Sequence, residues 1–383
     1  MADELKGERS QRRQAEAELK SLTAMTTVPV LRELTENRRM TKLQYRGSWQ
    51  NTGPEVTEGV PAVFPALTGP SPNRLTFARW LVSADNPLTA RVLVNRYWEA
   101  LFGRGLVTTS EDFGSQGELP THPTLLDWLA TEMIRIGWDR KALLKTIVMS
   151  ATYRQTARVS SADLAADPDN RWLGRGPRVR LSAEMVRDQA LFASGLLSAK
   201  MYGAPVNPPQ PSLGLRAAFG SSTDWKTSMG EDRYRRGIYT SWRRSNPYPS
   251  MATFDAPNRE VCTVRRNSTN TPLQSLVTLN DPAYVEAAQS LARLTLQHSD
   301  ELDNQLGYAF RRCLIRPPTE TELSALRTLY EDTRAGFTDE ARATELATSP
   351  LGELPDGIQV RDAAAMTVVG NVLLNLDEMF LKR

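Results

Sequence analysis

The stretch "REVCTVRRNSTNTPLQSLVTLNDP" at 259–282 places Cys262 among arginines, carboxylates and amides. Arg259, Arg265 and Arg266 are close to it in sequence, and cations lower the pKa of a thiol when they also lie close in space. No histidine is near in sequence to act as a base, although His122 could approach in the fold. One hypothesis for this stretch is therefore a nucleophilic cysteine.

Two structural roles compete with that chemistry. The second cysteine, Cys313, falls at helical spacing with Leu306, Phe310 and Leu314, which indicates packing in a core. In an oxidising compartment Cys262 and Cys313 could instead form a disulfide, because the chain has no other cysteine. We favour packing over a disulfide, and a disulfide over a nucleophile.

The segment 233–266 combines arginines with aromatic rings. It holds eight arginines against Asp255 and Glu260. Guanidinium groups form forked hydrogen bonds to sulfate, phosphate or carboxylate, and aromatic rings stack on sugars or bases. The alternative, which we favour, is that these arginines satisfy carbonyls and carboxylates of an irregular segment packed on a helical body. The candidates for ligand binding are Tyr239, Trp242, Arg243, Arg244, Arg259, Arg265 and Arg266.

Three carboxylates and one histidine could carry out acid–base chemistry. Asp112, Asp255 and Glu260 lie in expected loops, and His122 precedes Pro123 at an expected helix start. Two carboxylates held several ångströms apart can hydrolyse a glycoside, and a helix N-terminus favours a neutral imidazole that can act as a base. The four are therefore the catalytic candidates, although turn formation and capping are the more usual roles of such loop residues.

The composition excludes several classes of site and leaves the location open. The net charge of +3 is the small remainder of 47 cations and 44 anions, so it predicts no global field. No run approaches the roughly 18 apolar residues of a membrane span, and the charged N-terminus is no export signal. Two cysteines exclude an all-cysteine structural zinc site, two histidines disfavour a multi-histidine metal site, and the lack of a C-x-x-C-H excludes covalent haem attachment. No metal site is therefore expected. The chain is then either cytosolic or a fragment of a longer protein.

Three regions are expected along the 383 residues. Residues 1–24 form a connecting helix or tail, 25–75 an extended strand and proline-rich segment, and 76–383 a mainly helical domain with an irregular insertion at about 200–268. Capping residues such as Asp85 or Asn86, and Asp139, mark helix starts. The helical pattern after 271 breaks at Asp281–Pro282.

The predicted fold class is mainly α: an irregular helical domain with a few short strands and a long middle segment rich in proline and arginine. The stretches "KLQYRGSWQ" and "RGIYTSWRRS" are the expected strands, because both are rich in β-prone residues.

Five blocks carry a resemblance to a known family. In order they are "NPLTARVLVNRYWEALFGRGLV", "EDFGSQGELPTHPTLLDWLA", "GWDRKALLKTIVMSATYRQ", "FDAPNREVCTVRRNSTNTPLQSLVTLNDP" and "IRPPTETEL". Over roughly residues 26–383 the chain resembles the planctomycete-type domain of unknown function 1553 family. Such domains usually lie at the C-terminus of very large exported proteins that also carry a cytochrome-c-like module.

The resemblance implies a periplasmic or extracellular protein connected with polymer use or electron transfer, and it brings no known reaction. Any haem would belong to N-terminal modules outside this chain, so no cofactor is expected within it. We expect a non-enzymatic module that binds an anionic polysaccharide or another domain of the parent protein, with nucleic acid disfavoured. The alternatives are a polysaccharide-directed hydrolase-like enzyme and a docking body for the cytochrome-c-like module.

Overall fold

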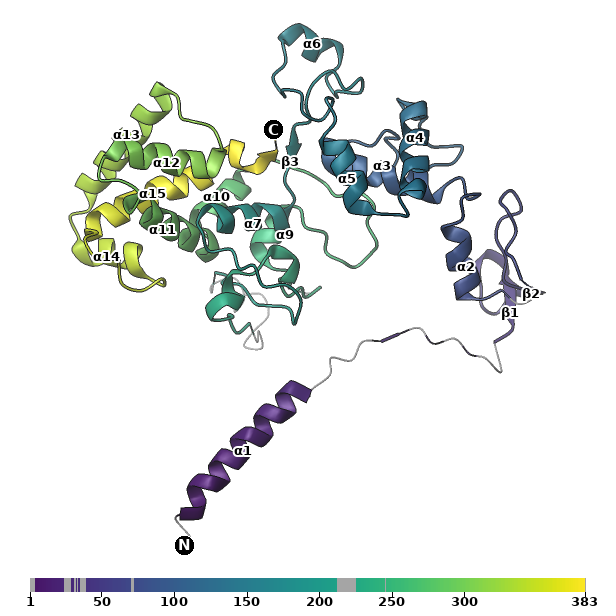
Figure 1. The fold of residues 1–383 in the computed structure, drawn as a ribbon, viewed down its shortest axis with the longest axis horizontal. Coiled ribbons are helices and arrows are strands. Elements are labelled where there is room, and N and C mark those ends of the chain that lie inside the picture. The colour runs from purple at the N-terminus through teal and green to yellow at the C-terminus, as the bar shows by residue number, and fades with distance from the viewer. Residues whose placement is uncertain are drawn as a thin grey trace. The chain divides into compact units, whose positions relative to one another are not determined.

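The computed structural model describes residues 4–23, 29, 30, 32, 34, 39–69, 72–211, 225–244 and 246–382 (Figure 1). Helices dominate these ranges, where the strands form only two two-stranded sheets, so the predicted mainly α class is confirmed. The chain divides into two compact units, Met1–Thr89 and Ala90–Arg383. No helix in the described ranges is both long and apolar enough to cross a membrane.

Unit 1 begins with a helix whose described side chains, at 7–20, are all exposed, as the polar sequence predicts. A β-hairpin follows, in which Thr41 is opposite Val56. It confirms a short strand at the start of the stretch "KLQYRGSWQ", of which Tyr45–Gly47 forms a 3-10 turn instead. The proline-rich segment packs on the last helix of the unit, because Trp80 Nε1 donates a 2.7 Å hydrogen bond to the Pro65 carbonyl. The elements are α1 (Glu4–Thr23), β1 (Thr41–Gln44), η1 (Tyr45–Gly47), β2 (Thr52–Val56) and α2 (Arg74–Leu81).

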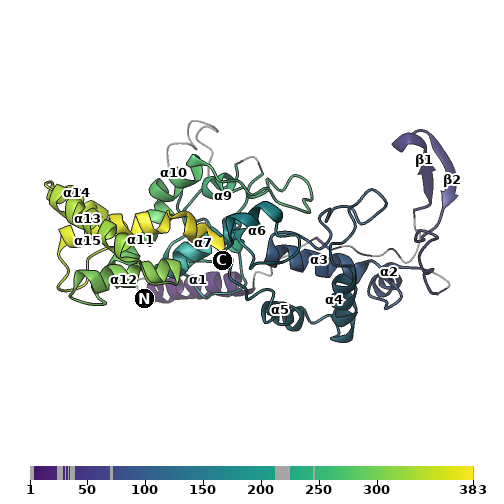
Figure 2. The ribbon, with the colours of Figure 1, turned by 90° about the horizontal axis from the view of Figure 1, so that it is seen from above.

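Three helices at the start of unit 2 share one apolar core. They are α3 (Thr89–Phe102), α4 (Pro123–Arg135) and α5 (Arg140–Val148), and they lie together in Figures 1 and 2. Val94, Met133 and Leu143 meet in this core with no exposed surface. Asp139 caps α5 as predicted, because its Oδ1 accepts hydrogen bonds from the amides of Lys141 and Ala142 at 2.9 and 3.1 Å.

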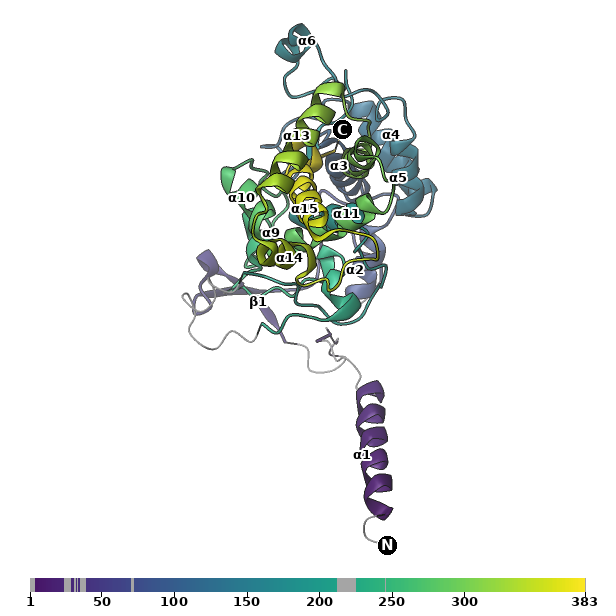
Figure 3. The same cartoon turned by 90° about the vertical axis from the view of Figure 1, so that its left-hand side faces the viewer.

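The second core of unit 2 is built around α11 (Pro282–Leu296) and α15 (Val360–Leu374). Figure 3 shows α15 among α11, α13 and α14. Small residues allow α11 and α15 to approach closely: a Cβ at Gly370 would lie 3.1 Å from the Ala288 carbonyl oxygen. The surrounding elements are α7 (Ala183–Ala193), α9 (Pro249–Thr253), α10 (Pro272–Asn280), α12 (Leu302–Leu314), α13 (Glu320–Gly336) and α14 (Glu340–Thr348).

The predicted break at Asp281–Pro282 is confirmed. Helix α10 ends at Asn280, and Asp281 becomes the N-cap of α11, its Oδ1 accepting a 2.9 Å hydrogen bond from the Ala283 amide. Pro282 occupies the first turn, where its missing N–H leaves no helical hydrogen bond unmade.

The expected strand in "RGIYTSWRRS" is wrong. The stretch forms a 3-10 turn, η4 (Gly237–Tyr239), followed by isolated bridges from Thr240 to Val206 and from Arg243 to Asn246. The Gly237 amide donates a 2.5 Å hydrogen bond to Asp188 Oδ1 on α7 rather than to a strand. A Cβ at Gly237 would lie 2.8 Å from the Glu184 Cα, so glycine permits this close approach.

The remaining elements of unit 2 are short. The strands β3 (Val179–Arg180) and β4 (Leu381–Lys382) pair antiparallel, with Arg180 opposite Leu381. Lys382 Nζ donates a 2.7 Å hydrogen bond to the Leu101 carbonyl, which ties β4 to α3, and burial lowers the pKa of Lys382 to about 8. The other short elements are α6 (Ser161–Ala166), η3 (Gly230–Tyr234) and η5 (Asp377–Phe380).

Candidate functional site

Two of the four catalytic candidates lie before α4. Asp112 Oδ1 accepts a 2.6 Å hydrogen bond from the Gly114 amide, which is a turn-forming contact. His122 occupies the N-cap position of α4 but makes no side-chain cap bond. Its Nδ1 is 3.0 Å from Thr121 Oγ1, and its ring meets Trp172 edge to face at 6.3 Å. The Asp112 contact stabilises a turn, and the His122 ring forms an aromatic pair with Trp172.

The other two candidates lie in the segment between α9 and α10. Asp255 accepts hydrogen bonds from the backbone amide and the hydroxyl of Thr269 at 2.7 to 3.0 Å. Glu260 Oε2 accepts a 3.0 Å hydrogen bond from Asn258 Nδ2. No hydrogen bond joins any two of the four catalytic candidates, all of which are described, so their observed contacts are those of loops and turns.

The two cysteines are free thiols in different surroundings. Cys313 is 3% exposed in the second core, and burial raises the pKa of its thiol to about 12, so its predicted packing is confirmed. Cys262 is exposed, because every residue from 258 to 270 is exposed. Its exposure contradicts the packing expected for Cys262, and no bridge to Cys313 is formed in this structure.

Four of the eight arginines in 233–266 hold the scaffold together. Arg233 forms a two-pronged ion pair with the buried Glu286, one bond being 2.8 Å long. Arg235 is 1% exposed and donates to the carbonyls of Lys200, Tyr202 and Ala204, while its guanidinium covers the Tyr239 ring at 3.7 Å. Arg236 and Arg266 pair with carboxylates of α7, Asp188 at 3.1 Å and Glu184 at 2.7 Å.

The other four arginines are exposed, and we name Arg243, Arg244, Arg259 and Arg265 the arginine strip. In the part of the chain that the structure describes, no carboxylate pairs with any of their guanidinium groups. Arg259 covers the Trp242 ring at 4.9 Å, and Trp242 Nε1 donates a 3.1 Å hydrogen bond to the Asn258 carbonyl. Of the predicted ligand-binding residues, Tyr239, Trp242 and Arg266 have structural partners, and Trp242 also packs against the second core, whereas the strip guanidinium groups are exposed.

The exposed loop 258–270 is held near both ends. Asp255 binds Thr269, and Arg266 reaches Glu184 on α7 with a 2.7 Å ion pair. Although burial acts to raise it, the hydrogen bond from Arg266 keeps the pKa of Glu184 below its ordinary value. The strip arginines Arg259 and Arg265 therefore project from a loop with fixed attachment points.

A buried ionic cluster, absent from the sequence predictions, lies where Arg233 contacts α7 and α11. Glu286 is 1% exposed, Asp281 3% and Arg187 4%. Burial raises the pKa of Asp281 to about 6, and Arg187 Nη2 donates a 2.9 Å hydrogen bond to the Arg233 carbonyl. The sequence signal was Glu286 next to Ala287 and Ala288 on the buried face of α11, where an isolated charge requires a partner.

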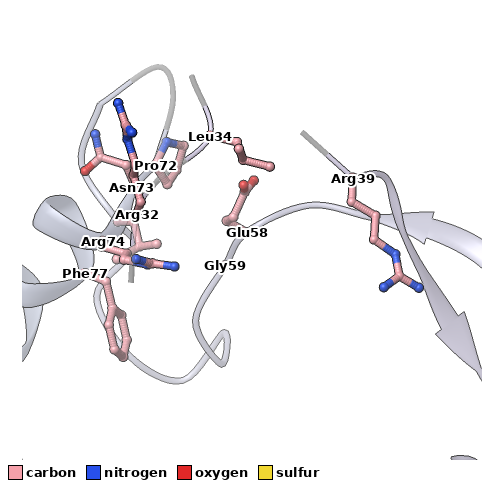
Figure 4. Close-up of a pocket in the computed structure, with 10 residues that line it drawn as sticks. Arg32, Leu34, Arg39, Glu58, Gly59, Pro72, Asn73, Arg74 and Phe77 are labelled. Atoms are coloured by element: carbon pink, nitrogen blue, oxygen red, sulfur yellow. The ribbon is translucent and has the colours of Figure 1, made fainter. Parts of the chain in front are cut away.

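Each unit has a cleft among its described residues. The cleft of unit 1, about 570 Å³ in volume, is lined by Arg32, Arg39, Arg74, Glu58 and Phe77 (Figure 4). None of the predicted site residues lines it. The cleft of unit 2, about 480 Å³, lies beside α6 and is lined by residues of 158–175, Trp172 among them.

In the described part of the chain, no group of three or more histidine, cysteine, aspartate or glutamate side chains converges in a way that could hold a metal ion.

Comparison with known proteins identifies the family. The family model described as "PSD1: Protein of unknown function (DUF1553)" matches residues 73–330. The chain belongs to this family. No curated protein and no solved structure matches it. The resemblance carried by the five blocks is thereby confirmed. The matched residues include the arginine strip, all four catalytic candidates and Cys262.

Proposed function

We propose that this DUF1553 protein is a binding module that holds an anionic polysaccharide through the arginine strip. The observation that carries the proposal is the division of the arginines within one short segment. Arg233, Arg235, Arg236 and Arg266 have carboxylate or carbonyl partners, whereas the strip presents four guanidinium groups to solvent. A guanidinium with no protein partner keeps its five N–H donors for a ligand.

The geometry of the strip suits sulfate or carboxylate groups on a polymer. Guanidinium is planar and donates paired hydrogen bonds to such groups. The Trp242 ring lies under the Arg259 guanidinium and packs against the second core, so it holds that cation at the surface. The Asp255–Thr269 contacts hold the loop before a ligand arrives, which reduces the entropy lost on binding.

The test is binding of the whole chain to heparin, a polymer carrying both sulfate and uronate, by isothermal titration calorimetry over a series of salt concentrations. Replacing all four strip residues by alanine should weaken binding by about fourfold or more and flatten the salt dependence, since each exposed charge contributes about 0.2–1 kcal/mol.

The matched control replaces two exposed arginines that lie on α14 and α15. Arg342→Ala with Arg361→Ala should leave the affinity unchanged. Equal affinity of the strip variant and the unaltered chain would contradict the proposal. Assaying the same heparin for new reducing ends tests the hydrolase alternative at the same time.

A specific observation also favours a partner domain as a second candidate. Helix α10, which follows the loop, exposes Leu273 at 64% and Leu276 at 56%, and Val261 within the loop is 71% exposed. Adjacent exposed apolar side chains are typical of protein contacts. If the ligand is another domain, Leu273→Ser with Leu276→Ser should weaken its binding more than removal of the strip, with little dependence on salt.

A further inference from the structure

The cleft of unit 2 lies in a separate lobe of that unit, and no predicted site residue lines the cleft. Residues 156–176, including α6, form this lobe, which extends from the body of unit 2 in Figures 1 and 3. Its cleft of about 480 Å³ is lined by Arg158, Ser160, Asp163, Trp172 and Arg175, among others. Both polar and aromatic groups therefore face one concave space.

Trp172 lies in this cleft with 68% of its surface exposed. Its backbone is nevertheless held in place, because its amide donates a 2.9 Å hydrogen bond to Asp167 Oδ2 while the Arg171 amide donates to Oδ1 at 2.8 Å. The ring also meets His122 edge to face at an interplanar angle of 68°. An exposed indole on a backbone that is already held in place can stack on a ligand with less loss of entropy than one on a free loop.

The turn that carries Trp172 is maintained against local strain. Asn170 and Leu173 adopt left-handed backbone conformations, with φ of 51° and 56°. A branched residue such as leucine is disfavoured there. Side chains hold the turn in place: Arg175 donates to the carbonyls of Asp167 and Pro168, both at 2.8 Å. Strain maintained in this way is concentrated at binding sites.

Two charged groups complete the cleft. Arg158 is exposed, and its guanidinium has no hydrogen-bond or ion-pair partner among the residues that the structure describes. Asp163 Oδ2 accepts a 2.7 Å hydrogen bond from the Ser160 hydroxyl, and the carboxylate retains acceptor positions for ring hydroxyls. The cleft thus offers an aromatic face, a cation and a hydroxyl acceptor.

From this arrangement we infer that the Trp172 cleft binds one uronate unit of an oligosaccharide. The apolar face of the pyranose ring stacks on Trp172, the sugar carboxylate binds the Arg158 guanidinium, and a ring hydroxyl donates to Asp163. The arginine strip recognises charge along a polymer, whereas this cleft recognises the shape and charge of a single ring. The inference does not depend on the strip, which could fail its own test while the cleft binds.

The experiment titrates the full chain with tetragalacturonate and with the neutral α-1,4-linked galactotetraose, using calorimetry. Saturable binding of the uronate is expected, with Trp172→Ala weakening it at least tenfold and Trp172→Phe, which keeps a stacking ring, remaining within a few-fold. Arg158→Ala should remove the preference for the uronate over the neutral sugar. The matched controls are Trp128→Ala, a 51% exposed tryptophan on α4, and Arg342→Ala, both of which should bind normally.

Three results would overturn the inference. The first is the absence of saturable uronate binding up to about 10 mM, a concentration near the weak limit of specific recognition. The others are an unchanged affinity of Trp172→Ala, and a loss of binding that occurs only in the variant without the arginine strip. A normal unfolding midpoint for Trp172→Phe and Arg158→Ala separates loss of the site from loss of the fold.

Discussion

The carboxylate of Asp255 binds both the backbone amide and the hydroxyl of Thr269, at 2.7 Å and at 2.8 to 3.0 Å. These contacts close the exposed segment that carries Arg259, Cys262 and Arg265. Asp255 itself has a left-handed backbone, with φ of 61°, which aspartate tolerates better than most residues. A side chain that the sequence presents as a catalytic candidate thus holds a loop in place.

Removing this contact should loosen the loop without unfolding the domain. Asp255→Ala loses the charge-assisted hydrogen bonds, so amide hydrogen exchange over 258–268 should become faster, with a fall of about 1–3 kcal/mol in the free energy of unfolding. Thr269→Val removes the hydroxyl alone and should have a smaller effect in the same direction. The matched control is Glu260→Ala, an exposed carboxylate of the same loop, and equal exchange rates in the three variants would contradict the assignment.

The pair formed by Glu286 and Arg233 should be the most sensitive ionic contact of unit 2. Glu286 is 1% exposed, so Glu286→Ala leaves a partly buried guanidinium without its partner and should lower the free energy of unfolding by about 3–5 kcal/mol. Urea unfolding measures this change. The double variant Glu286→Leu with Arg233→Met should be less destabilised than Glu286→Ala, because no unpaired charge remains. A loss below about 1 kcal/mol for Glu286→Ala would mean that Arg233 finds another partner.

Asp281 should make unit 2 less stable as the pH rises from about 4 to 6. Its pKa is about 6 in the fold against 3.8 ordinarily, so between these values the folded chain retains a proton that the unfolded chain releases. The free energy of unfolding therefore falls across this window and stays lower above it. Asp281→Asn keeps a side-chain oxygen for the Ala283 amide but carries no charge, and should be roughly 1–3 kcal/mol more stable at pH 7.

Urea unfolding midpoints of the unaltered chain and of Asp281→Asn, measured between pH 4 and pH 8, test this directly. The gain in stability of the variant should disappear toward pH 4. Asp139→Asn, an exposed N-cap on α5, is the matched control and should show no comparable gain. A gain of equal size at every pH would point to packing rather than to the proton.

The two cysteines should react at very different rates. Cys262 is exposed, whereas Cys313 is 3% exposed and burial raises its pKa to about 12. One thiol per chain should therefore react quickly with a disulfide reagent in native buffer, and the second only after denaturation. Cys262→Ser should abolish the fast phase. Finding no reactive thiol in the native, unreduced chain would instead show that a bridge forms in solution.

Local sequence determined much of the helical architecture. Asp139 caps α5, and Asp281 with Pro282 starts α11, because capping joins a side chain to amides two or three residues away. Contacts of this kind are readable from spacing alone. The strand expected in "RGIYTSWRRS" failed for the opposite reason, since the Gly237 amide finds its acceptor on α7, 49 positions away in sequence.

The roles of the charged residues were decided by the tertiary structure. Arg265 and Arg266 are neighbours in sequence, yet Arg266 pairs with Glu184, 82 positions away, and Arg265 is left to solvent. Local sequence contains no information on which distant carboxylate a side chain will reach, because that depends on how helices pack. The sequence thus determined the helices, their caps, the family blocks and a surplus of arginine, whereas packing decided which charges are buried, which remain exposed and that Trp172 stands in a cleft.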